Sequence, residues 1–252
     1  MLDQITPVIL TRDEAPNIAR TLGQLTWASD IVVVDSFSTD DTVEIAKGFP
    51  NVRVLQRKFD VLATQWMFGL EHVSTPWLLA LDADYFVPDE LVRELQRLTP
   101  PAAVRGYRSR FLYAMGGRVL RGSLYPPHIV LAATAHSRVW QDGHAQRLVV
   151  EGEVGDLDTP IIHDDRKSFR AFVSRQKRYM ALEADKLRSA DPLSIGFSGR
   201  VRKLIVVAPF AALFHTLLVK HLILDGRAGL FYAWERFVAE LILSRELLRR
   251  RK

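Results

Sequence analysis

The sequence of 252 residues contains no cysteine. Disulfide frameworks, zinc sites built from cysteine and thiol nucleophiles are therefore excluded, and the composition fits a reducing compartment such as the cytosol. No Gly-x-Gly-x-x-Gly follows the first apolar run, which argues against a dinucleotide-dependent oxidoreductase. The start, MLDQITPVILTRDE, lacks the basic flank and the long apolar centre of a secretory signal, so we expect a first β-strand there.

Internal repeats, low-complexity tracts and Gly/Ser linkers are also missing, while 48% hydrophobic residues are enough for a substantial core. The net charge of +5 is unevenly spread: residues 196–252 hold 11 Lys and Arg against 4 Asp and Glu, and residues 1–195 hold 23 against 25. A basic segment rich in Leu, Val, Ile, Phe and Trp suits an anionic membrane surface, because membrane binding adds apolar burial to electrostatic attraction. We expect no nucleic-acid partner.

Short apolar runs rich in β-branched residues alternate with helical patterns over the first hundred residues. This alternation predicts an α/β fold with a doubly wound, mostly parallel sheet. Residues 102–162 contain several glycine and proline breakers, which predict mixed sheet and loops. The expected strands are 7–11, 30–35, 51–55 and 77–81, and the expected helices are 16–27, 61–72 and 88–98, with a further helix opening at residues 39–41.

The chain beyond residue 166 has helical spacing. A helix is predicted over 167–190 and ends at Asp191-Pro192. Leu204–Val219 lacks Lys, Arg, Asp and Glu but is too short to span a bilayer, so we expect an interfacial or core helix. We divide the chain into a catalytic domain, 1–190, and a basic helical tail, 191–252, that packs on the domain, on the membrane surface, or on both. The apolar face of its last helix, 230–248, comprises Trp234, Phe237, Val238, Leu241 and Leu248.

Two carboxylates, Asp82 and Asp84, follow the apolar strand that starts at Trp77. Ligands of open parallel sheets bind at the carboxyl ends of the strands. Carboxylates at i and i+2 on a bending strand end can converge on one hard cation and its diphosphate, which suits Mg²⁺ or Mn²⁺. The structural alternative is that both merely cap the following helix or sit in a solvated turn.

Two earlier strands end in polar loops as well: Thr11-Arg-Asp-Glu14 follows the first, and Asp35-Ser-Phe-Ser-Thr-Asp-Asp-Thr42 follows the second. Three of the four expected strands would thus present polar ends together. Alternatives stay open: Arg12 and Glu14 could form a surface ion pair, and Asp35 could cap the turn to Thr39. We expect Asp40 and Asp41 to cap a helix.

These three loops, in this order, resemble those of the family 2 glycosyltransferases. Phe59-Asp60, Gln65, Tyr107-Arg-Ser-Arg110 and Asp225-Gly-Arg-Ala-Gly229 make the chain most similar to the enzymes of lipopolysaccharide-core and capsule synthesis. The resemblance covers nearly the whole chain. It implies a GT-A fold with a helical appendage at the membrane surface.

The resemblance also implies a donor site. Thr11, Arg12, Glu14 and Asp35 would hold the nucleotide base and ribose, and Asp82 and Asp84 would hold a metal-bound diphosphate. Gln65 would reach the nucleotide or the sugar, although Met67 stands where the family frequently has Asn.

An inverting transfer needs a general base for the acceptor hydroxyl. Related enzymes usually have an acidic residue after His or Glu in the region of residues 141–146, but position 145 is Ala here. We therefore rank Asp142 and His144 first as base and Glu151 next.

His163 opens the acidic and basic run His163-Asp-Asp-Arg-Lys167. In GT-A enzymes a late His often completes the metal site, and a neutral imidazole can ligate the cation that Asp84 holds. The alternative is a helix start capped by Asp164 or Asp165. Arg108 and Arg110 could contact an anionic acceptor, or they could form a solvated strand face.

The sequence thus predicts an inverting, metal-assisted transferase that moves a sugar from a nucleotide-sugar donor, a UDP-sugar, to a glycolipid or oligosaccharide acceptor. We expect it in the cytoplasm, peripheral on the inner face of the cytoplasmic membrane. One alternative is a catalytically degenerate, membrane-associated nucleotide-binding scaffold. Another is a phosphotransferase with Asp82 as nucleophile, which would place the Asp-x-Asp on the first strand rather than the fourth.

Overall fold

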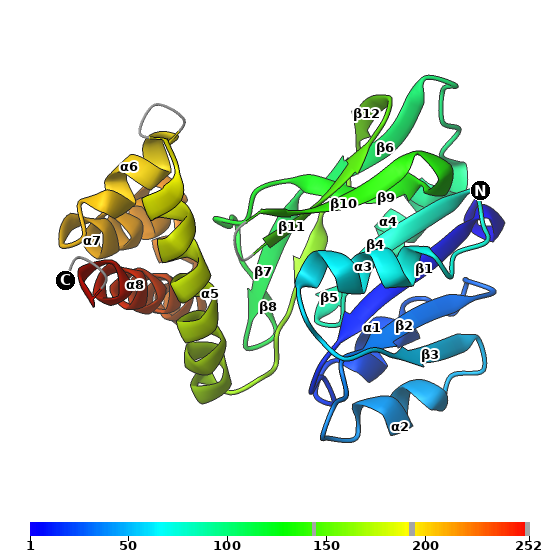
Figure 1. Ribbon diagram of the computed structural model, residues 1–252, viewed down its shortest axis with the longest axis horizontal. Helices are drawn as coiled ribbons and strands as arrows, with labels where there is room; N and C mark the ends of the chain where they lie inside the picture. Colours follow the sequence, from blue (N-terminus) through cyan, green and yellow to red (C-terminus); the bar gives the residue numbers. More distant parts are fainter. Residues whose placement is uncertain (143–144, 192–194, 250–252) are drawn as a thin grey trace. The chain divides into compact units, whose positions relative to one another are not determined.

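The computed structural model describes residues 1–142, 145–191 and 195–249, with the backbone alone for residues 141, 142 and 145–147. The chain forms two compact units (Figure 1). Unit 1 comprises Met1–Leu112 and Tyr125–Arg166, and unit 2 comprises Tyr113–Leu124 and the chain from Lys167 onward. The helix predicted over 167–190 therefore groups with the tail and not with the catalytic domain, because it packs along the last helix of the chain.

Unit 1 is built on a seven-stranded sheet of order β12-β6-β9-β4-β1-β2-β3. Strands β4, β1, β2 and β3 run parallel, β12 is parallel to β6, and β9 is antiparallel to both of its neighbours, β4 and β6. The doubly wound, mostly parallel sheet predicted from the sequence is confirmed. The strands are β1 (Ile5–Thr11), β2 (Ile31–Asp35), β3 (Val52–Gln56), β4 (Trp77–Asp82), β6 (Val104–Ser109), β9 (His128–Ala133) and β12 (Glu153–Asp156).

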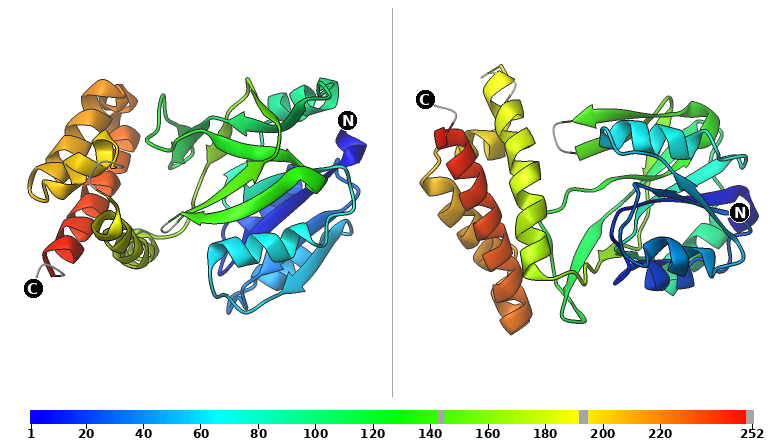
Figure 2. Two further views of the ribbon diagram at one scale, coloured as in Figure 1. Left: turned by 45° about the horizontal axis from the view of Figure 1, so that its top comes forward. Right: turned by 60° about the horizontal axis from the view of Figure 1, so that its bottom comes forward.

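Helices cover both faces of this sheet because the central strands are apolar on both sides. Ile9 and Val33 contribute to the core beneath helices α1 and α4, whereas Val8 and Val34 pack beneath α3. A hairpin of β10 and β11 lies beside α3 and completes the second core (Figure 2). These elements are α1 (Ile18–Gly23), α2 (Thr42–Lys47), α3 (Leu62–Leu70), α4 (Asp89–Arg97), β10 (Ser137–Asp142) and β11 (Ala145–Val150), with short 3₁₀ turns η1 (Leu2–Gln4) and η2 (Thr134–His136).

A short antiparallel pair returns the end of unit 1 to the carboxyl end of β4. Strand β13 (Ile161–His163) pairs with β5 (Tyr85–Phe86), with His163 opposite Tyr85. Strand β7 (Phe111–Met115) begins in unit 1 and continues into unit 2, where it forms a hairpin with β8 (Arg118–Val119). The β5–β13 pair is what places a late histidine beside the Asp-x-Asp loop.

Unit 2 is helical, and α8 packs against both α5 and α7 (Figure 2). Ser168 begins α5 because its side chain accepts a hydrogen bond from the backbone N–H of Ala171. The helix predicted over 204–219 is divided into α7 and a π-helical turn. The elements are α5 (Phe169–Ser189), α6 (Phe197–Lys203), α7 (Val207–Phe214), η3 (His215–Val219), η4 (Leu222–Asp225) and α8 (Gly226–Arg249).

Within the described residues no single helix is long and apolar enough to cross a membrane. One pair, Val207–Val219 with Leu222–Arg249, satisfies the length and composition required only when its two bent parts, 73° apart, are taken together.

The Asp225-Gly-Arg-Ala-Gly229 segment fixes the β7–β8 hairpin onto α8. The buried carboxylate of Asp225 accepts hydrogen bonds from the backbone N–H and the Nε of Arg121. Tyr232 accepts one from the backbone N–H of Leu124. A Cβ on Gly229 would lie 1.8 Å from the carbonyl oxygen of Leu222, so only glycine permits this approach. The segment is therefore structural within unit 2.

Candidate functional site

The loops that follow β1 and β2 are joined around the carboxylate of Asp35. This side chain is fully buried and accepts hydrogen bonds from Thr11 Oγ1 at 3.1 Å, from the N–H of Ser38 at 3.0 Å and from Gln56 Nε2 at 3.1 Å. The hydroxyl of Ser38 donates to it as well. The turn role that was the alternative for Asp35 is thus present in the structure, and Thr11 also donates a hydrogen bond to this carboxylate.

A second set of contacts ties the same two loops together further out. Asp13, which has a left-handed φ of 54°, accepts hydrogen bonds from the N–H and the hydroxyl of Thr39. The backbone N–H of Glu14 donates to Thr42 Oγ1 at 2.7 Å. Arg12, between these residues, is exposed. Asp13 was not among the site residues predicted from the sequence. Asp adopts this left-handed backbone conformation more readily than most residues do.

The helix after β2 is capped by Asp40 rather than by Asp41. Asp40 accepts hydrogen bonds from the N–H and hydroxyl of Thr42 and from the N–H of Ala15, whereas Asp41 makes no side-chain cap. Burial disfavours the charged form of Asp40, but these hydrogen bonds outweigh it and lower the pKa of the carboxyl group.

Gln65 is buried rather than exposed to a ligand. Its amide nitrogen donates to Ser36 Oγ at 2.8 Å and to the carbonyl of Arg57 at 3.0 Å, and its oxygen accepts from Arg57 Nη1 at 2.8 Å. Arg57 also binds Asp60 through both terminal nitrogens, which lowers the pKa of the Asp60 carboxyl group. Gln65 therefore positions Arg57 beside the end of β3.

Asp84 and His163 meet at the carboxyl end of β4. Asp84 Oδ2 lies 3.3 Å from His163 Nε2, and both side chains are largely buried. The other oxygen, Asp84 Oδ1, is buried and has no hydrogen-bond partner among the described residues. Asp82 ends β4 and is half-buried in the same region. A buried carboxylate oxygen without a donor is costly, so this one is suited to a cation.

The strand end behind this pair is anchored by Arg20. Its guanidinium contacts the Asp164 carboxylate at 3.1 Å and donates to the Asp164 carbonyl at 2.6 Å, while the Asp164 N–H donates to the Asp84 carbonyl at 2.9 Å. Burial lowers the pKa of Arg20, against the raising effect of Asp164. The alternative interpretation, a helix start capped by Asp164 or Asp165, is wrong, because Ser168 caps α5.

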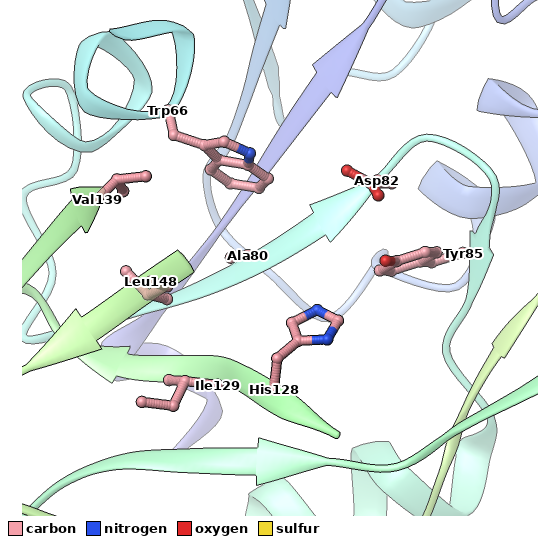
Figure 3. A pocket seen from close by; sticks show the side chains of 8 residues that line it. All are labelled: Trp66, Ala80, Asp82, Tyr85, His128, Ile129, Val139 and Leu148. Atoms are coloured by element: carbon pink, nitrogen blue, oxygen red, sulfur yellow. The ribbon is translucent and has the colours of Figure 1, made fainter. Parts of the chain in front are cut away.

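A small cavity of about 20 Å³ lies next to Asp82 (Figure 3). This volume is enough for roughly one water molecule. Its lining residues come from α3, β4, β5, β9 and the β10–β11 hairpin. Because these elements are far apart in the sequence, no local pattern predicts the cavity. The lining residues are Trp66, Ala80, Asp82, Tyr85, His128, Ile129, Val139 and Leu148.

Two titratable residues of this cavity were not among the predicted site residues. His128 stacks on Phe111, with ring centroids 4.3 Å apart, and burial lowers its pKa, so the imidazole is neutral at pH 7. Tyr85 lies with its hydroxyl 3.2 Å from that of Tyr125, and burial raises its pKa, as does the charge of Asp82. His128 points toward the cavity in Figure 3. No local motif marks either residue.

The candidate bases follow β9. Asp142 ends β10 at the tip of the hairpin, where its backbone pairs with Ala145, and its side chain is not described. His144 lies outside the described residues. Glu151 bonds through its N–H to the carbonyl of His136, at the amino end of β4, and its carboxylate contacts Arg138 at 3.3 Å. Glu151 is therefore remote from the Asp82 end of the strand.

The two arginines expected at an acceptor surface already have protein partners. Arg108 forms a bidentate pair with Asp156 at 2.9 and 3.0 Å, and Arg110 donates to the carbonyl of Asp158 at 2.8 Å. All four residues are exposed. This arrangement matches the solvated strand face that was the alternative.

The residues at the end of β4 fit a divalent cation in part. No three His, Asp or Glu side chains within residues 1–142, 145–191 and 195–249 converge closely enough to hold a metal by themselves. Asp84 and His163 can supply two ligands. Such partial sites suit Mg²⁺ or Mn²⁺, which are often bound by one or two carboxylates together with substrate phosphates and water.

Comparison with known proteins matches residues 7–99 to the sequence model of glycosyl transferase family 2. A Rickettsia felis protein described as an uncharacterized glycosyltransferase is 34% identical over 96 residues, covering 38% of this chain and 32% of that protein. The chain thus spans about a third of the length of this relative. The lipopolysaccharide core biosynthesis glycosyltransferase LpsC of Rhizobium meliloti is 26% identical over 223 residues, covering 81% of this chain and 77% of that protein.

Among solved structures, glucosyl-3-phosphoglycerate synthase from Mycobacterium tuberculosis, in complex with Mn²⁺, UDP and glucosyl-3-phosphoglycerate, superposes with a TM-score of 0.50 at 15% identity. The match covers 75% of this chain and 82% of that one. At this identity the likeness concerns the fold, and it confirms the GT-A architecture expected from the sequence.

Proposed function

We propose that the chain, whose residues 7–99 match the sequence model of glycosyl transferase family 2, transfers a sugar from a nucleoside diphosphate donor, a UDP-sugar, to a glycolipid or oligosaccharide acceptor. The relatives support this proposal with their printed names, and the M. tuberculosis enzyme supports the choice of UDP and a divalent metal because its structure contains both.

One observation carries the proposal: the close approach of Asp84 and His163 at the carboxyl end of β4, with Asp84 Oδ1 buried and lacking a hydrogen-bond donor among the described residues. Folding a carboxylate into such a place costs free energy unless a ligand compensates for it. Strand ends of open α/β sheets are where ligands bind, so the feature lies where a donor diphosphate is expected.

The nucleotide would lie on the loops after β1 and β2. Thr11 and Asp35 form the buried floor of this region, and Arg12 and Glu14 lie on the loop above it. Asp35 can accept a hydrogen bond from a base or ribose only if one of its present donors moves away, and Gln56 is the most exposed of these donors. Gln65 acts through Arg57 as a positioning residue.

A divalent cation held by Asp84 and His163, with Asp82 nearby, would neutralise charge on the departing diphosphate. The residues of the chain do the rest. Arg20 and Asp164 fix the backbone of Asp84, and Tyr85, opposite His163 in the β5–β13 pair, packs against the imidazole at a ring-centroid distance of 5.6 Å.

In the proposed inverting reaction the acceptor oxygen forms a bond to the anomeric carbon while the bond to the diphosphate breaks. The acceptor proton passes to a general base on the opposite face of the sugar. Asp142 and His144 remain the proposed bases. Asp142 ends β10, and Val139 of this strand lines the same cavity as Asp82. His144 lies outside the described residues and is proposed from the sequence alone. Glu151 lacks a suitable position.

An acceptor linked to lipid would place the reaction at the cytoplasmic face of a membrane. Arg108 and Arg110 could contact such an acceptor only after exchanging their present partners. Their proposed role is therefore secondary to that of the donor site.

Release of UDP from UDP-hexoses tests the proposal, measured with Mn²⁺ in the presence and absence of lipid-linked oligosaccharide acceptors. The proposal predicts acceptor-stimulated release that is absent in Asp84→Ala. Release that continues unchanged in Asp84→Ala would contradict it. Asp41→Ala, an exposed carboxylate without a side-chain cap, is the matched control.

A second candidate is a catalytically degenerate scaffold that binds nucleotide without transfer. The observation in its favour is Ala145 at a position where related enzymes carry an acidic residue, together with a cavity large enough for roughly one water. Binding of UDP with no donor turnover under any acceptor would select this function over the first.

A further inference from the structure

Helix α8 of unit 2 buries Leu243 and Leu247 in an apolar core, but it also buries charged residues and leaves large apolar side chains exposed. Its buried residues include Glu235, Glu240 and Ser244. Large apolar side chains of the same helix are exposed, among them Trp234 at 49% and Leu248 at 51%. Globular helices normally bury the apolar stripe and expose the charges. Three of the five residues of the apolar face predicted from the sequence are in fact exposed: Trp234, Leu241 and Leu248.

Ion pairs and hydrogen bonds stabilise this polar interior. Arg202 donates to Glu240 at 2.9 Å and to Glu183 at 3.1 Å, and both carboxylates are less than 10% exposed. Ser244 Oγ donates to the carbonyl of Ile205 at 2.7 Å. Buried charges are tolerated when they are paired, so these residues can share the interior of the bundle with apolar residues such as Leu243 and Leu247. Other large apolar side chains of α8 remain exposed.

Exposed apolar side chains are concentrated in this unit. In the described part of the chain, 18 of 22 large exposed hydrophobic residues belong to unit 2 and 4 belong to unit 1. An aromatic row joins two helices: the Phe237 ring of α8 lies 5.4 Å from Phe210 of α7 and 5.6 Å from Trp234. Phe210 is 60% exposed. Apolar patches of this extent mark interaction surfaces.

The two units also differ in net charge, and unit 2 is the basic one. By sequence, unit 2 holds 20 Lys and Arg against 7 Asp and Glu, whereas unit 1 holds 14 against 22. Several of these cations lie close to exposed apolar residues. Lys220 follows Leu218 and Val219, both exposed, and packs beside Gly122, which adjoins the exposed guanidinium of Arg121. A surface that is both apolar and cationic is complementary to an anionic bilayer, which offers acyl chains and phosphate groups together.

We propose that unit 2 docks in the plane of an anionic membrane, with Phe210 and Trp234 entering the acyl boundary and Lys220 and Arg227 contacting lipid phosphates. The docking surface consists of the exposed apolar side chains of α6, α7, η3, η4 and α8. This surface would supply the membrane contact that a lipid-linked acceptor requires. That biological role rests on the proposed function, whereas the docking itself does not.

Co-flotation of the purified full chain with lipid vesicles tests the docking surface. Wild type is expected to float with vesicles that contain phosphatidylglycerol, to float much less with pure phosphatidylcholine, and to be released by salt. Phe210→Ser combined with Trp234→Ser is expected to weaken partition at least about tenfold, since two large apolar side chains leave the bilayer. Trp140→Ser, a 65% exposed tryptophan of unit 1, is the matched control and should float as wild type does.

A wild type that does not float with anionic vesicles would overturn the proposal, as would a double variant that floats unchanged. So would sedimentation showing a wild-type dimer that the double variant converts to a monomer, because the surface would then bind a second copy. Lys220→Glu with Arg227→Glu, both exposed positions, provides a second test that leaves the apolar surface intact and should also lose binding to anionic vesicles.

UDP binding separates this inference from the proposed function. The Phe210 and Trp234 double variant should keep the wild-type affinity for UDP in the presence of Mn²⁺. Vesicle binding by a chain that binds no UDP would refute the donor site and leave the docking surface standing. A wild type that binds UDP but does not bind anionic vesicles would support the donor site and refute the docking surface.

Discussion

Asp84 Oδ2 lies 3.3 Å from His163 Nε2, although the two residues belong to different segments of unit 1, Met1–Leu112 and Tyr125–Arg166. The β5–β13 pair brings them together, with His163 opposite Tyr85. The bond from the Asp164 N–H to the Asp84 carbonyl closes the arrangement. A carboxylate and an imidazole held in this way resemble two ligands of an oxygen- and nitrogen-binding cation site.

His163→Ala is expected to weaken Mn²⁺-dependent UDP binding by about tenfold to a hundredfold, a loss typical of disturbed metal sites. The physical reason is removal of one nitrogen ligand beside Asp84. Calorimetric titration with UDP at fixed Mn²⁺ measures the change. His136→Ala, an exposed histidine at the other end of the sheet, should leave the affinity unchanged. Equal affinities of His163→Ala and wild type would remove His163 from the site.

Asp35→Ala is expected to lower the free energy of unfolding by about 2–5 kcal/mol, because Thr11, Ser38 and Gln56 lose a shared buried acceptor. Urea titration followed by circular dichroism measures this loss. Asp41→Ala replaces an exposed carboxylate further along the loop that follows β2, and it should change the free energy of unfolding by less than about 0.5 kcal/mol. A similar small effect in both variants would mean that the Asp35 network is not a structural support of the donor loops.

Gly69→Ala tests how closely α3 approaches the sheet. A Cβ there would lie 2.7 Å from Val8 Cγ1 and 3.1 Å from Val34 Cγ2, so we expect a loss of about 1–3 kcal/mol in the free energy of unfolding. Gly23→Ala, at the end of α1 with no atom within 4 Å of the added Cβ, should be neutral or stabilising by up to about 1 kcal/mol. Thermal unfolding that ranks the two variants in the opposite order would argue against this packing.

Stability should depend on pH through His128. Burial lowers its pKa below the ordinary 6.5, so the unfolded chain binds a proton that the folded chain does not. The contribution of His128 to the free energy of unfolding is therefore fully present above about pH 6.5, and it is lost as the pH falls below that value. His128→Phe, which retains a ring against Phe111, removes this contribution. The loss of unfolding free energy between about pH 7.5 and about pH 5.5 should be smaller in the variant than in wild type. An identical loss in both would contradict a buried neutral imidazole.

The sheet was predictable from the sequence because each strand carries its own local signal. Asp30-Ile-Val-Val-Val-Asp35 and Trp77-Leu-Leu-Ala-Leu-Asp82 are apolar runs of strand length that end in carboxylates, and parallel strands bring such ends to one edge. The helices were predicted slightly too long. α1 covers Ile18–Gly23 within the predicted 16–27, since helix ends depend on contacts that periodicity does not report.

Side-chain direction and long-range pairing were not predictable. Gln65 was expected near a ligand but is buried under Arg57, and only the packing of α3 on the sheet decides which way it faces. His128 reaches the cavity because β9 runs antiparallel beside β4, a pairing that no local motif encodes. The periodicity of α8 identified an apolar face but could not say whether that face lies inside, because the helix carries apolar residues in other directions as well, and Tyr232, Leu243 and Leu247 are the ones that are buried.

Calorimetric titration of UDP into the purified chain, with and without Mn²⁺, beside the isosteric variant Asp84→Asn, tests the donor site most directly. The proposed donor site predicts binding that requires Mn²⁺ and is lost in Asp84→Asn, whose fold should persist because its backbone contact with Asp164 is retained. UDP binding that is independent of the metal, or unchanged in Asp84→Asn, would contradict it.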